Sequence, residues 1–198
     1  MIEFINFNKS EPYSLFQEYY KNALNAEQKI IEAMSISSYS KTLKEVNSRF
    51  VNLKFVNGED FIFFSNYNSP KAIAFNEHSQ ICAVIFWNSI NVQIRIKANI
   101  KKTSEEFNKH YFANRDKKKN ALAISSNQSR KIDSYSDIEK KYNDNLSSSN
   151  LTECPKYWGG YSFKPYYFEF WEGHQYRLNR RDVYEIDCGE WQRSILEP

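Results

Sequence analysis

The chain has 198 residues, of which 41 % are hydrophobic and 26 % are charged, a composition typical of a globular protein with a real core. The net charge of +3, from 27 basic and 24 acidic residues, is too balanced to indicate a nucleic-acid partner. The aromatic content is high at 17 %, with only 5 glycines and 5 prolines, which excludes a low-complexity chain and favours β-structure with bulky side-chain pairs between strands.

The first predicted elements are helical and cover about residues 11–34. One apolar stripe recurs at three- and four-residue spacing and is formed by Leu15, Phe16, Tyr19, Tyr20, Ala23 and Leu24. The preceding proline is tolerated in the first turn of a helix. A second helix is predicted over residues 26–34.

A two-residue period between residues 35 and 101 indicates a series of strands. They are predicted at residues 49–55, 61–64, 81–87 and 91–101. Asn57-Gly58 is a hairpin signal between the first two strands. The continuous apolar run at 81–87 predicts a strand that is buried on both faces. Between these strands, Ser69-Pro70-Lys71 begins a short helix through Phe75.

The remaining chain is predicted to be helical first and then extended. Helices are expected at 104–124 and 134–146, and a polar, irregular loop at 146–155. In the aromatic C-terminal third, strand spacing places Arg177, Asn179 and Arg181 on one face, which suits an anionic or strongly polar ligand. Strands with a few interspersed helices predict an antiparallel β-barrel decorated by helices, without an internal repeat.

The cysteines and the hydropathy indicate the compartment. Cys82, Cys154 and Cys188 form no CxxC pair and no zinc-ligand cluster with the histidines, so we expect free thiols and no metal. Free thiols are typical of a reducing cytoplasm. The N-terminus lacks a basic region followed by an apolar run, and no apolar stretch approaches the roughly 20 residues that span a bilayer. We therefore expect a cytoplasmic protein with no signal peptide and no membrane partner.

Two predicted helices carry candidate anion-binding residues. Tyr111 and Arg115 share a helix face, where a phenol and a planar guanidinium make a phosphate clamp, although a surface stack of the two is the alternative. Lys71 lies at a helix start, where a cation opposes the dipole unless an anion binds there.

Two further pairs extend this set of candidates. Arg49 and Lys54 point to opposite faces of a regular strand and can serve two different anions, or one of them is simply exposed. Gln128-Ser129 offers an amide and a hydroxyl after a helix, or is an ordinary turn. No nucleophile or nucleotide-binding motif is present, which agrees with a cofactor supplying the reactive atoms and equally with no catalysis.

Taken together, these stretches resemble the pyridoxamine 5'-phosphate oxidase family in order and spacing, from about Glu11 to Pro198. The matching stretches are Arg49–Lys54, Phe63–Lys71, Phe86-Trp87, Gln93, Tyr111–Arg115, Gln128-Ser129, Trp158–Tyr161, Glu169–Gly173, Arg177-Leu178 and Trp191–Pro198. The resemblance implies a mainly β protein with helices, an antiparallel split β-barrel that is a homodimer with FMN at the subunit interface. It also implies a single FMN-binding domain over residues 1–198, with a helical segment at about 11–34 and the barrel and its helices over 35–198.

The resemblance further implies a role for particular residues. The flavin is expected to contact Arg49, Phe64, Ser65, Lys71, Gln93, Gln128, Ser129, Trp171 and Arg181. The substrate is expected to contact Lys54, Tyr111, Arg115, Lys119, Arg177 and Asn179, of which Arg177 and Asn179 are the catalytic pair. The implied reaction, in vitamin B6 metabolism, converts pyridoxamine or pyridoxine 5'-phosphate to pyridoxal 5'-phosphate, with O2 as acceptor and H2O2 as product.

The chain departs from the family pattern at several positions. Asn179 replaces a histidine that normally contacts the substrate, and Lys119 replaces a serine of the usual phosphate site. Pro70 stands where a basic residue usually assists the flavin phosphate, and the family's N-terminal Arg-x-x-Tyr is absent from residues 1–10. Two alternatives therefore stay open: an FMN-dependent oxidase of another substrate, as in phenazine pathways, and a non-catalytic protein that binds flavin or pyridoxal phosphate.

Overall fold

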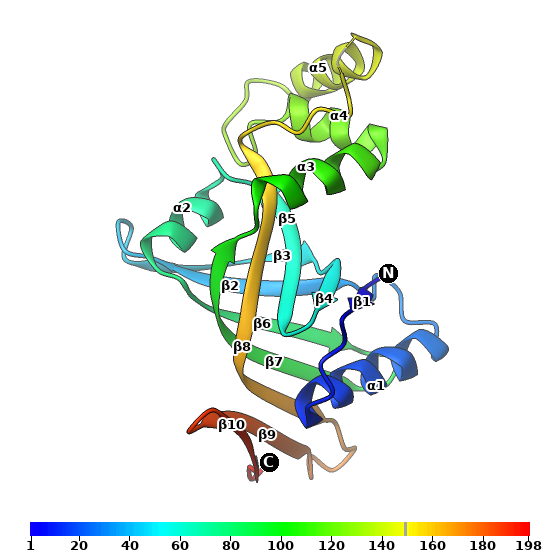
Figure 1. Ribbon diagram of the computed structural model, residues 1–198, viewed down its shortest axis with the longest axis vertical. Helices are drawn as coiled ribbons and strands as arrows, with labels where there is room; N and C mark the ends of the chain where they lie inside the picture. The colour runs from blue at the N-terminus through cyan, green and yellow to red at the C-terminus, as the bar shows by residue number, and fades with distance from the viewer. Residues whose placement is uncertain (149) are drawn as a thin grey trace.

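The centre of the protein is one ten-stranded sheet, shown by a computed structural model that describes residues 1–148 and 150–198 (Figure 1). The strands are β1 (Glu3–Ile5), β2 (Ala33–Ser40), β3 (Glu45–Asn52), β4 (Phe55–Asn57), β5 (Asp60–Asn66), β6 (Gln80–Trp87), β7 (Val92–Lys102), β8 (Trp158–Glu172), β9 (Arg180–Asp187) and β10 (Glu190–Ile195). Their spatial order is β1-β4-β5-β8-β7-β6-β2-β3, with β9 beside β8 and β10 beside β9. Neighbouring strands are antiparallel except β1 and β4.

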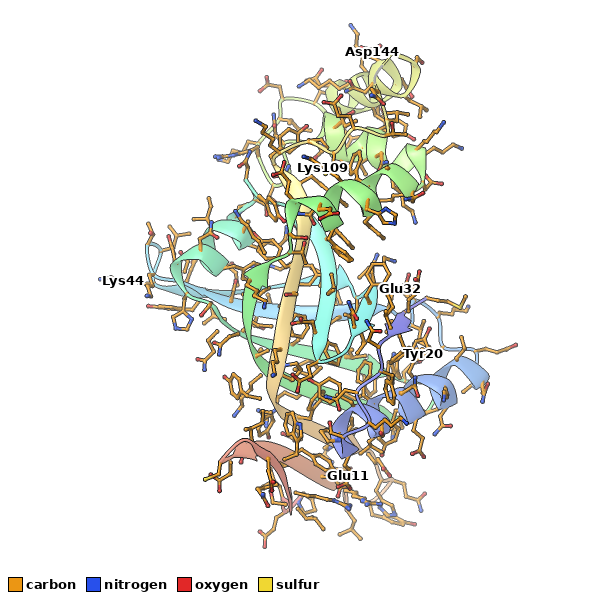
Figure 2. All side chains as sticks on the ribbon, viewed as in Figure 1. Glu11, Tyr20, Glu32, Lys44, Lys109 and Asp144 are labelled. Carbon is orange, nitrogen blue, oxygen red and sulfur yellow. The ribbon has the colours of Figure 1, made fainter. Side chains whose placement is uncertain are left out.

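Five helices pack around this sheet in the described part of the chain (Figure 1). They are α1 (Glu11–Asn25), α2 (Pro70–Glu77), α3 (Glu105–Asn114), α4 (Lys117–Ser125) and α5 (Tyr135–Ser148). Figure 1 shows α3, α4 and α5 gathered at one end of the long strand β8, and the β9–β10 hairpin at its other end. Helix α1 is held near that hairpin because Glu11, labelled in Figure 2, accepts hydrogen bonds from Tyr184 and Arg193. None of the helices described is long and apolar enough to cross a membrane.

The predicted apolar stripe of α1 is confirmed as a core element except at Leu24, which is 43 % exposed. Phe16 and Tyr20 are buried, and the Phe16 ring lies 5.0 Å from that of Phe61 and 5.7 Å from that of Trp87. The predicted second helix over 26–34 is wrong. Turns with positive φ at Glu27 and Ile30 end the helical path, and Ala33 already pairs in β2.

The strand pattern is confirmed in outline and corrected in detail. The hairpin at Asn57-Gly58 joins β4 to β5, and Gly58 has the positive φ of 58° that such a turn requires. The predicted strand 49–55 is interrupted after Asn52, because the Lys54 amide turns to the Ile62 carbonyl at 2.8 Å. Lys54 therefore lies outside the strand that carries Arg49.

Strand β6 is not buried on both faces, contrary to the prediction. Its residues alternate between buried and partly exposed, and Phe86 is 52 % exposed next to the buried Trp87. The apolar run therefore arises because β6 has apolar side chains on both faces: one face packs in the core, and the other is partly exposed in the single chain.

The helical prediction over 104–124 is also corrected. Residues Arg115 and Asp116 separate α3 from α4, and the Asp116 carboxylate caps α4 by accepting from the Lys119 amide at 3.0 Å. Helices α2 and α5 are confirmed. Of the predicted loop over 146–155, residues 146–148 extend α5, residue 149 lies outside the described residues, and 150–155 form turns and irregular chain.

Candidate functional site

A buried lysine stands at the start of α2, at the end of the sheet where α3 and α4 pack. Lys71 is 7 % exposed, and its Nζ donates to Ser65 Oγ at 3.0 Å, Ser69 Oγ at 3.1 Å and Gln128 Oε1 at 2.9 Å. Strand β5 supplies Ser65, and the segment after α4 supplies Gln128. We call Lys71, Ser65, Ser69 and Gln128 the lysine cradle. Its partners are all neutral, and within residues 1–148 and 150–198 no carboxylate forms an ion pair with Lys71.

A second cation lies near the lysine cradle. Burial, together with the neighbouring positive charge of Arg49, lowers the pKa of Lys71 to about 8. Arg49 projects from β3 and donates to the Ile36 carbonyl at 3.2 Å and to Ser38 Oγ at 2.9 Å. Burial also lowers the pKa of Arg49. Two partly desolvated cations without a carboxylate are costly unless an anion joins them, and a phosphate fits their donors.

An aromatic stack lies beside the cradle. The Tyr111 ring is parallel to Phe64 at 3.8 Å between centroids, and Phe64 is parallel to Trp158 at 5.2 Å. The Arg115 guanidinium lies over Trp158 at 5.1 Å from its centroid. Tyr111 and Arg115 thus both contact this aromatic stack. Arg115, however, is the residue that follows α3, so the two do not share a helix face as predicted.

Arg115 is fixed in place by the chain that follows it. Its Nη1 donates to the Lys119 carbonyl at 3.0 Å and to Asn120 Oδ1 at 3.1 Å. Burial lowers its pKa, with weaker opposing effects from Tyr111 and Asp116. No ion pair with a carboxylate holds it in the part of the chain that the structure describes. Arg115 is therefore a second candidate anion site with a preset geometry.

One pocket of about 210 Å³ joins these groups. Its lining includes Phe64, Ser65 and Gln128 from the predicted flavin set, and Arg115 and Lys119 from the predicted substrate set. Ser65 and Gln128 connect it to Lys71 through their hydrogen bonds. The structure thus brings these predicted residues together. Ser129 follows Gln128 in the same turn and has a positive φ of 66°.

Lys54 is not among the residues that line this pocket. Its Nζ is paired with Glu32 Oε1 at 3.3 Å. Figure 2 shows Glu32 near the N-terminal strand, and its carboxylate is also 3.8 Å from the Met1 amino group. Lys54 is thereby distinguished from Arg49, Lys71 and Arg115, because its charge is already compensated in the single chain.

Sequence reasoning assigned no role to three residues of this site. Ser69 precedes the helix that carries Lys71, and Trp158 forms the platform under Arg115. Gly159 pairs with Ser65, and a Cβ at this position would overlap the Tyr67 hydroxyl and the Asn108 amide. The two glycines of Trp158-Gly159-Gly160 could have indicated this part of the site from the sequence, because glycine is required where other groups approach the backbone closely.

A separate set of predicted flavin residues lies at the far end of β8. Gln93, Trp171 and Arg181 are register partners on β7, β8 and β9, so their side chains share one face in one row. Strand β8 has 15 residues and a contour length of roughly 45 Å at about 3.3 Å per residue. The single chain therefore separates this row from the lysine cradle, and Figure 1 shows β9, which carries Arg181, well apart from α2, which carries Lys71.

The prediction that Arg177 and Asn179 lie on a strand with Arg181 is wrong. Residues 173–179 form a loop, Arg177 has a positive φ of 62°, and β9 begins at Arg180. Asn179 Oδ1 accepts from the His174 amide at 3.0 Å and so closes this loop. Arg177 is exposed, and its loop joins the end of β8 that carries Trp171 to the start of β9, which carries Arg181.

A mostly antiparallel, unclosed sheet with a cationic cradle at one end of its longest strand defines a split β-barrel protein with a candidate anion site. The structure of PhzG from Burkholderia lata 383, in complex with tetrahydrophenazine-1-carboxylic acid, has this fold, with a TM-score of 0.90, 23 % identity and coverage of 96 % of this chain and 93 % of that chain. A pyridoxamine 5'-phosphate oxidase-related, FMN-binding protein from Nostoc punctiforme is similar in fold, with a TM-score of 0.74, 11 % identity and coverage of 92 % and 97 %.

Sequence comparison identifies the family. A pyridoxine/pyridoxamine 5'-phosphate oxidase of Hydrogenovibrio crunogenus is 36 % identical over 195 residues, covering 96 % of this chain and 89 % of the relative. One from Leptospira interrogans is 32 % identical over 192 residues, with coverage of 96 % and 89 %. The family model of the pyridoxine 5'-phosphate oxidase C-terminal dimerisation region matches residues 158–198. The chain belongs to the pyridoxine/pyridoxamine 5'-phosphate oxidase family, which confirms the resemblance seen in the sequence.

Proposed function

We propose that this protein is an FMN-dependent oxidase that converts pyridoxamine or pyridoxine 5'-phosphate to pyridoxal 5'-phosphate, with O2 as acceptor and H2O2 as product. The lysine cradle carries the proposal: its buried cation has a second cation, Arg49, nearby and is paired with no carboxylate among the residues that the structure describes. The names of the relatives support the substrate, and the flavin set, which is intact except for the basic residue replaced by Pro70, supports the cofactor. The flavin, when bound, supplies a hydride acceptor that O2 reoxidises.

The residues at the cradle fit the phosphate of FMN. Lys71 and Arg49 supply charge, while Ser65 and Gln128 supply a hydroxyl and an amide at hydrogen-bond distance from the lysine. Pro70 removes the family's extra basic side chain, but as the first residue of α2 it leaves the position of Lys71 unaffected. The full set proposed to hold the flavin is Arg49, Phe64, Ser65, Lys71, Gln93, Gln128, Ser129, Trp171 and Arg181.

Arg115 and its surroundings fit a second phosphate, that of the substrate. Its Nη1 is engaged by the chain, whereas its Nε and Nη2 make no hydrogen bond to the described residues and can donate to an anion. Lys119 lines the same pocket and adds a mobile cation where the family has a serine. We propose that Tyr111, Arg115 and Lys119 bind the substrate phosphate, and that Arg177 and Asn179 contact the substrate ring. Lys54 completes the proposed substrate set only if it exchanges its ion pair with Glu32 for the phosphate.

The separation of the two residue sets supports a homodimer with FMN at the interface. Arg177, Asn179 and the Gln93–Trp171–Arg181 row lie far along β8 from the lysine cradle, so a second copy must supply them to each site. The outer sheet face supports this arrangement: Phe50 is 77 % exposed and Phe86 is 52 % exposed, in adjacent rows of the register. The matched dimerisation region covers residues 158–198.

Replacing Phe50 with aspartate is expected to dissociate the proposed dimer, because it places a charge in an apolar contact. Sedimentation velocity of Phe50→Asp at micromolar concentration should give a monomer, and FMN affinity should fall with it. Ile30→Asp is the matched control, since Ile30 is equally exposed but lies in the turn before β2. A dimeric Phe50→Asp variant would contradict the proposed interface.

The affinity for FMN is expected to weaken above about pH 8. The pKa of Lys71 falls from 10.5 to about 8 in the folded chain, and the phosphate binds the protonated amine. Between about pH 8 and 10.5 the unfolded chain holds this proton more tightly than the folded one, so the flavin-free protein gains stability as the pH rises. The Kd for FMN should rise toward about tenfold per pH unit above the folded-state pKa. In Lys71→Arg, which stays charged, the Kd for FMN should not change between about pH 8 and 10.5. If the Kd rose equally in the wild type and in Lys71→Arg, deprotonation of Lys71 would not be the cause.

The visible spectrum of the protein with FMN tests the proposed function. Anaerobic pyridoxine 5'-phosphate should bleach the bound flavin, and air should restore its colour with release of peroxide. Bound flavin that stays oxidised would contradict the substrate. The absence of any flavin binding would contradict the cofactor as well.

A different substrate for the same flavin site is the second candidate function. Asn179 is engaged in closing its own loop, and Lys119 adds a cation to the pocket, so two substrate contacts differ from the family pattern. Reduction of the flavin by tetrahydrophenazine-1-carboxylic acid, the compound bound in the PhzG structure, but not by B6 phosphates, would favour this candidate. Tight FMN or pyridoxal phosphate binding without turnover of either would instead indicate a non-catalytic binding protein.

We also propose that residues 1–198 form one FMN-binding domain that acts in the cytoplasm. Support for the single domain comes from the sheet, whose strands run from Glu3 to Ile195. Support for the compartment comes from Cys82, Cys154 and Cys188, which are all free thiols.

A further inference from the structure

A buried carboxylate lies next to the Gln93–Trp171–Arg181 row. Glu169, on β8, is 3 % exposed although it belongs to the outer face of the sheet. Its Oε1 accepts from Arg181 Nε at 3.0 Å and lies 2.9 Å from Arg181 Nη2. Its Oε2 accepts from Arg95 Nε at 2.9 Å and from the Tyr167 hydroxyl at 2.8 Å, and also pairs with Arg95 Nη2. Both carboxylate oxygens are thus fully used.

The charge of this cluster explains why it is ordered. Burial opposes ionisation of Glu169, but the hydrogen bonds from Arg95, Tyr167 and Arg181 lower its pKa below the usual range. One carboxylate lies between two guanidinium groups, so the cluster keeps one excess positive charge. Without the buried carboxylate between them, the partly exposed Arg95 and Arg181 would repel one another.

The register shows which residues the carboxylate connects. Arg95 is directly opposite Glu169 on β7, two residues after Gln93, while Arg181 is opposite Trp171 on β9. The Arg181 side chain therefore reaches diagonally back along the sheet to Glu169. Its Nη1 also donates to the Glu197 carbonyl at 2.9 Å, which ties the C-terminal segment to the same arginine. Glu169 thus links three strands next to the row proposed to contact the flavin.

We propose that Glu169 is a positioning residue that fixes Arg181 for flavin binding without touching the flavin itself. This inference rests on the proposed function. A guanidinium held at two nitrogens by a buried carboxylate loses little conformational entropy when it binds a ligand. Because Arg95 is held by the other oxygen, the carboxylate also fixes the distance between β7 and β9 on either side of Trp171.

The test compares FMN affinity in matched variants by quenching of flavin fluorescence. Glu169→Gln keeps the shape but removes the charge and places an amide donor against an arginine, so the Kd for FMN should rise at least about tenfold. Glu185→Gln is the control, because Glu185 lies on the same face of β9 but is exposed. Its Kd should stay within about twofold of the wild type.

A double-mutant cycle separates positioning from a general effect on folding. In an Arg181→Met background, Glu169→Gln should change the Kd for FMN by less than about twofold, since the residue it acts through is gone. Sedimentation velocity and urea unfolding of each variant report assembly and stability directly. We expect dimers with cooperative unfolding throughout the series.

Four results would overturn the inference. Glu169→Gln binding FMN like the wild type would remove the role of the carboxylate. If Glu169→Gln raised the Kd for FMN in the Arg181→Met background by as much as it does in the wild type, Glu169 would not act through Arg181. If the Glu169→Gln protein were a monomer, its loss of FMN affinity would be due to failed dimer assembly. A wild-type protein that binds no FMN would overturn the proposed function together with the inference, and only this result would affect both.

Discussion

Replacing Lys71 with methionine is expected to abolish measurable FMN binding and, at the same time, to stabilise the flavin-free protein. The lysine is buried among neutral partners, so at pH 7 the folded chain holds an ammonium group that has lost most of its hydration. Methionine fills a similar volume without a charge, which should raise the free energy of unfolding by about 1–3 kcal/mol. The flavin phosphate then lacks its buried cation, and the Kd should rise at least about 100-fold.

Opposite changes in the two quantities make this result specific. A variant that merely misfolds loses both flavin affinity and stability, whereas Lys71→Met should lose the first and gain the second. Fluorescence titration with FMN and urea unfolding of the flavin-free protein measure them separately. Lys21→Met, on the exposed side of α1, should leave both unchanged. Retention of wild-type flavin affinity in Lys71→Met would mean that the cradle does not bind the phosphate.

The sequence predicts those elements whose pattern is local. The alternation at 91–101 specifies β7 because its apolar residues face the core along the whole strand. The interruption at Lys54 could not be predicted, since it depends on Lys54 changing its hydrogen-bond partner to Ile62. The helix predicted over 26–34 fails for a related reason: pairing of Ala33–Ser40 with two neighbouring strands outweighs the helical propensity of the segment before it.

The candidate site was predictable as a set of residues but not as an arrangement. Order and spacing identify Lys71, Ser65 and Gln128, yet their convergence requires β5, α2 and the turn after α4 to pack together. Arg177 shows the limit of pattern reasoning. Its spacing from Arg181 is that of a strand, but the chain leaves the sheet at Gly173, before it reaches Arg177. Gly173 packs so closely against the Asn91 side chain that a Cβ there would overlap it, and Arg177 has a positive φ. Such long-range contacts have no local signal in the sequence.

Replacing Arg177 with alanine is expected to lower kcat about 100-fold, as removal of one charged group from a reacting centre typically does. The Kd for FMN should stay within about twofold, because Arg177 lies in the exposed loop after β8 and belongs to the proposed substrate set. Stopped-flow measurement of anaerobic flavin reduction by pyridoxine 5'-phosphate reports this step directly. An unchanged reduction rate would remove the main catalytic assignment.

Mixing the two inactive variants should restore activity. If each site combines the lysine cradle of one subunit with the Arg177 loop of the other, a heterodimer of Lys71→Met and Arg177→Ala has one site with both defects and one with neither. Random exchange makes half of the dimers mixed, so the mixture should reach about a quarter of wild-type activity. A mixture of Lys71→Met with the double variant contains no intact site and is the control. If both sets came from one subunit, neither mixture would regain activity, because every site would carry at least one defect.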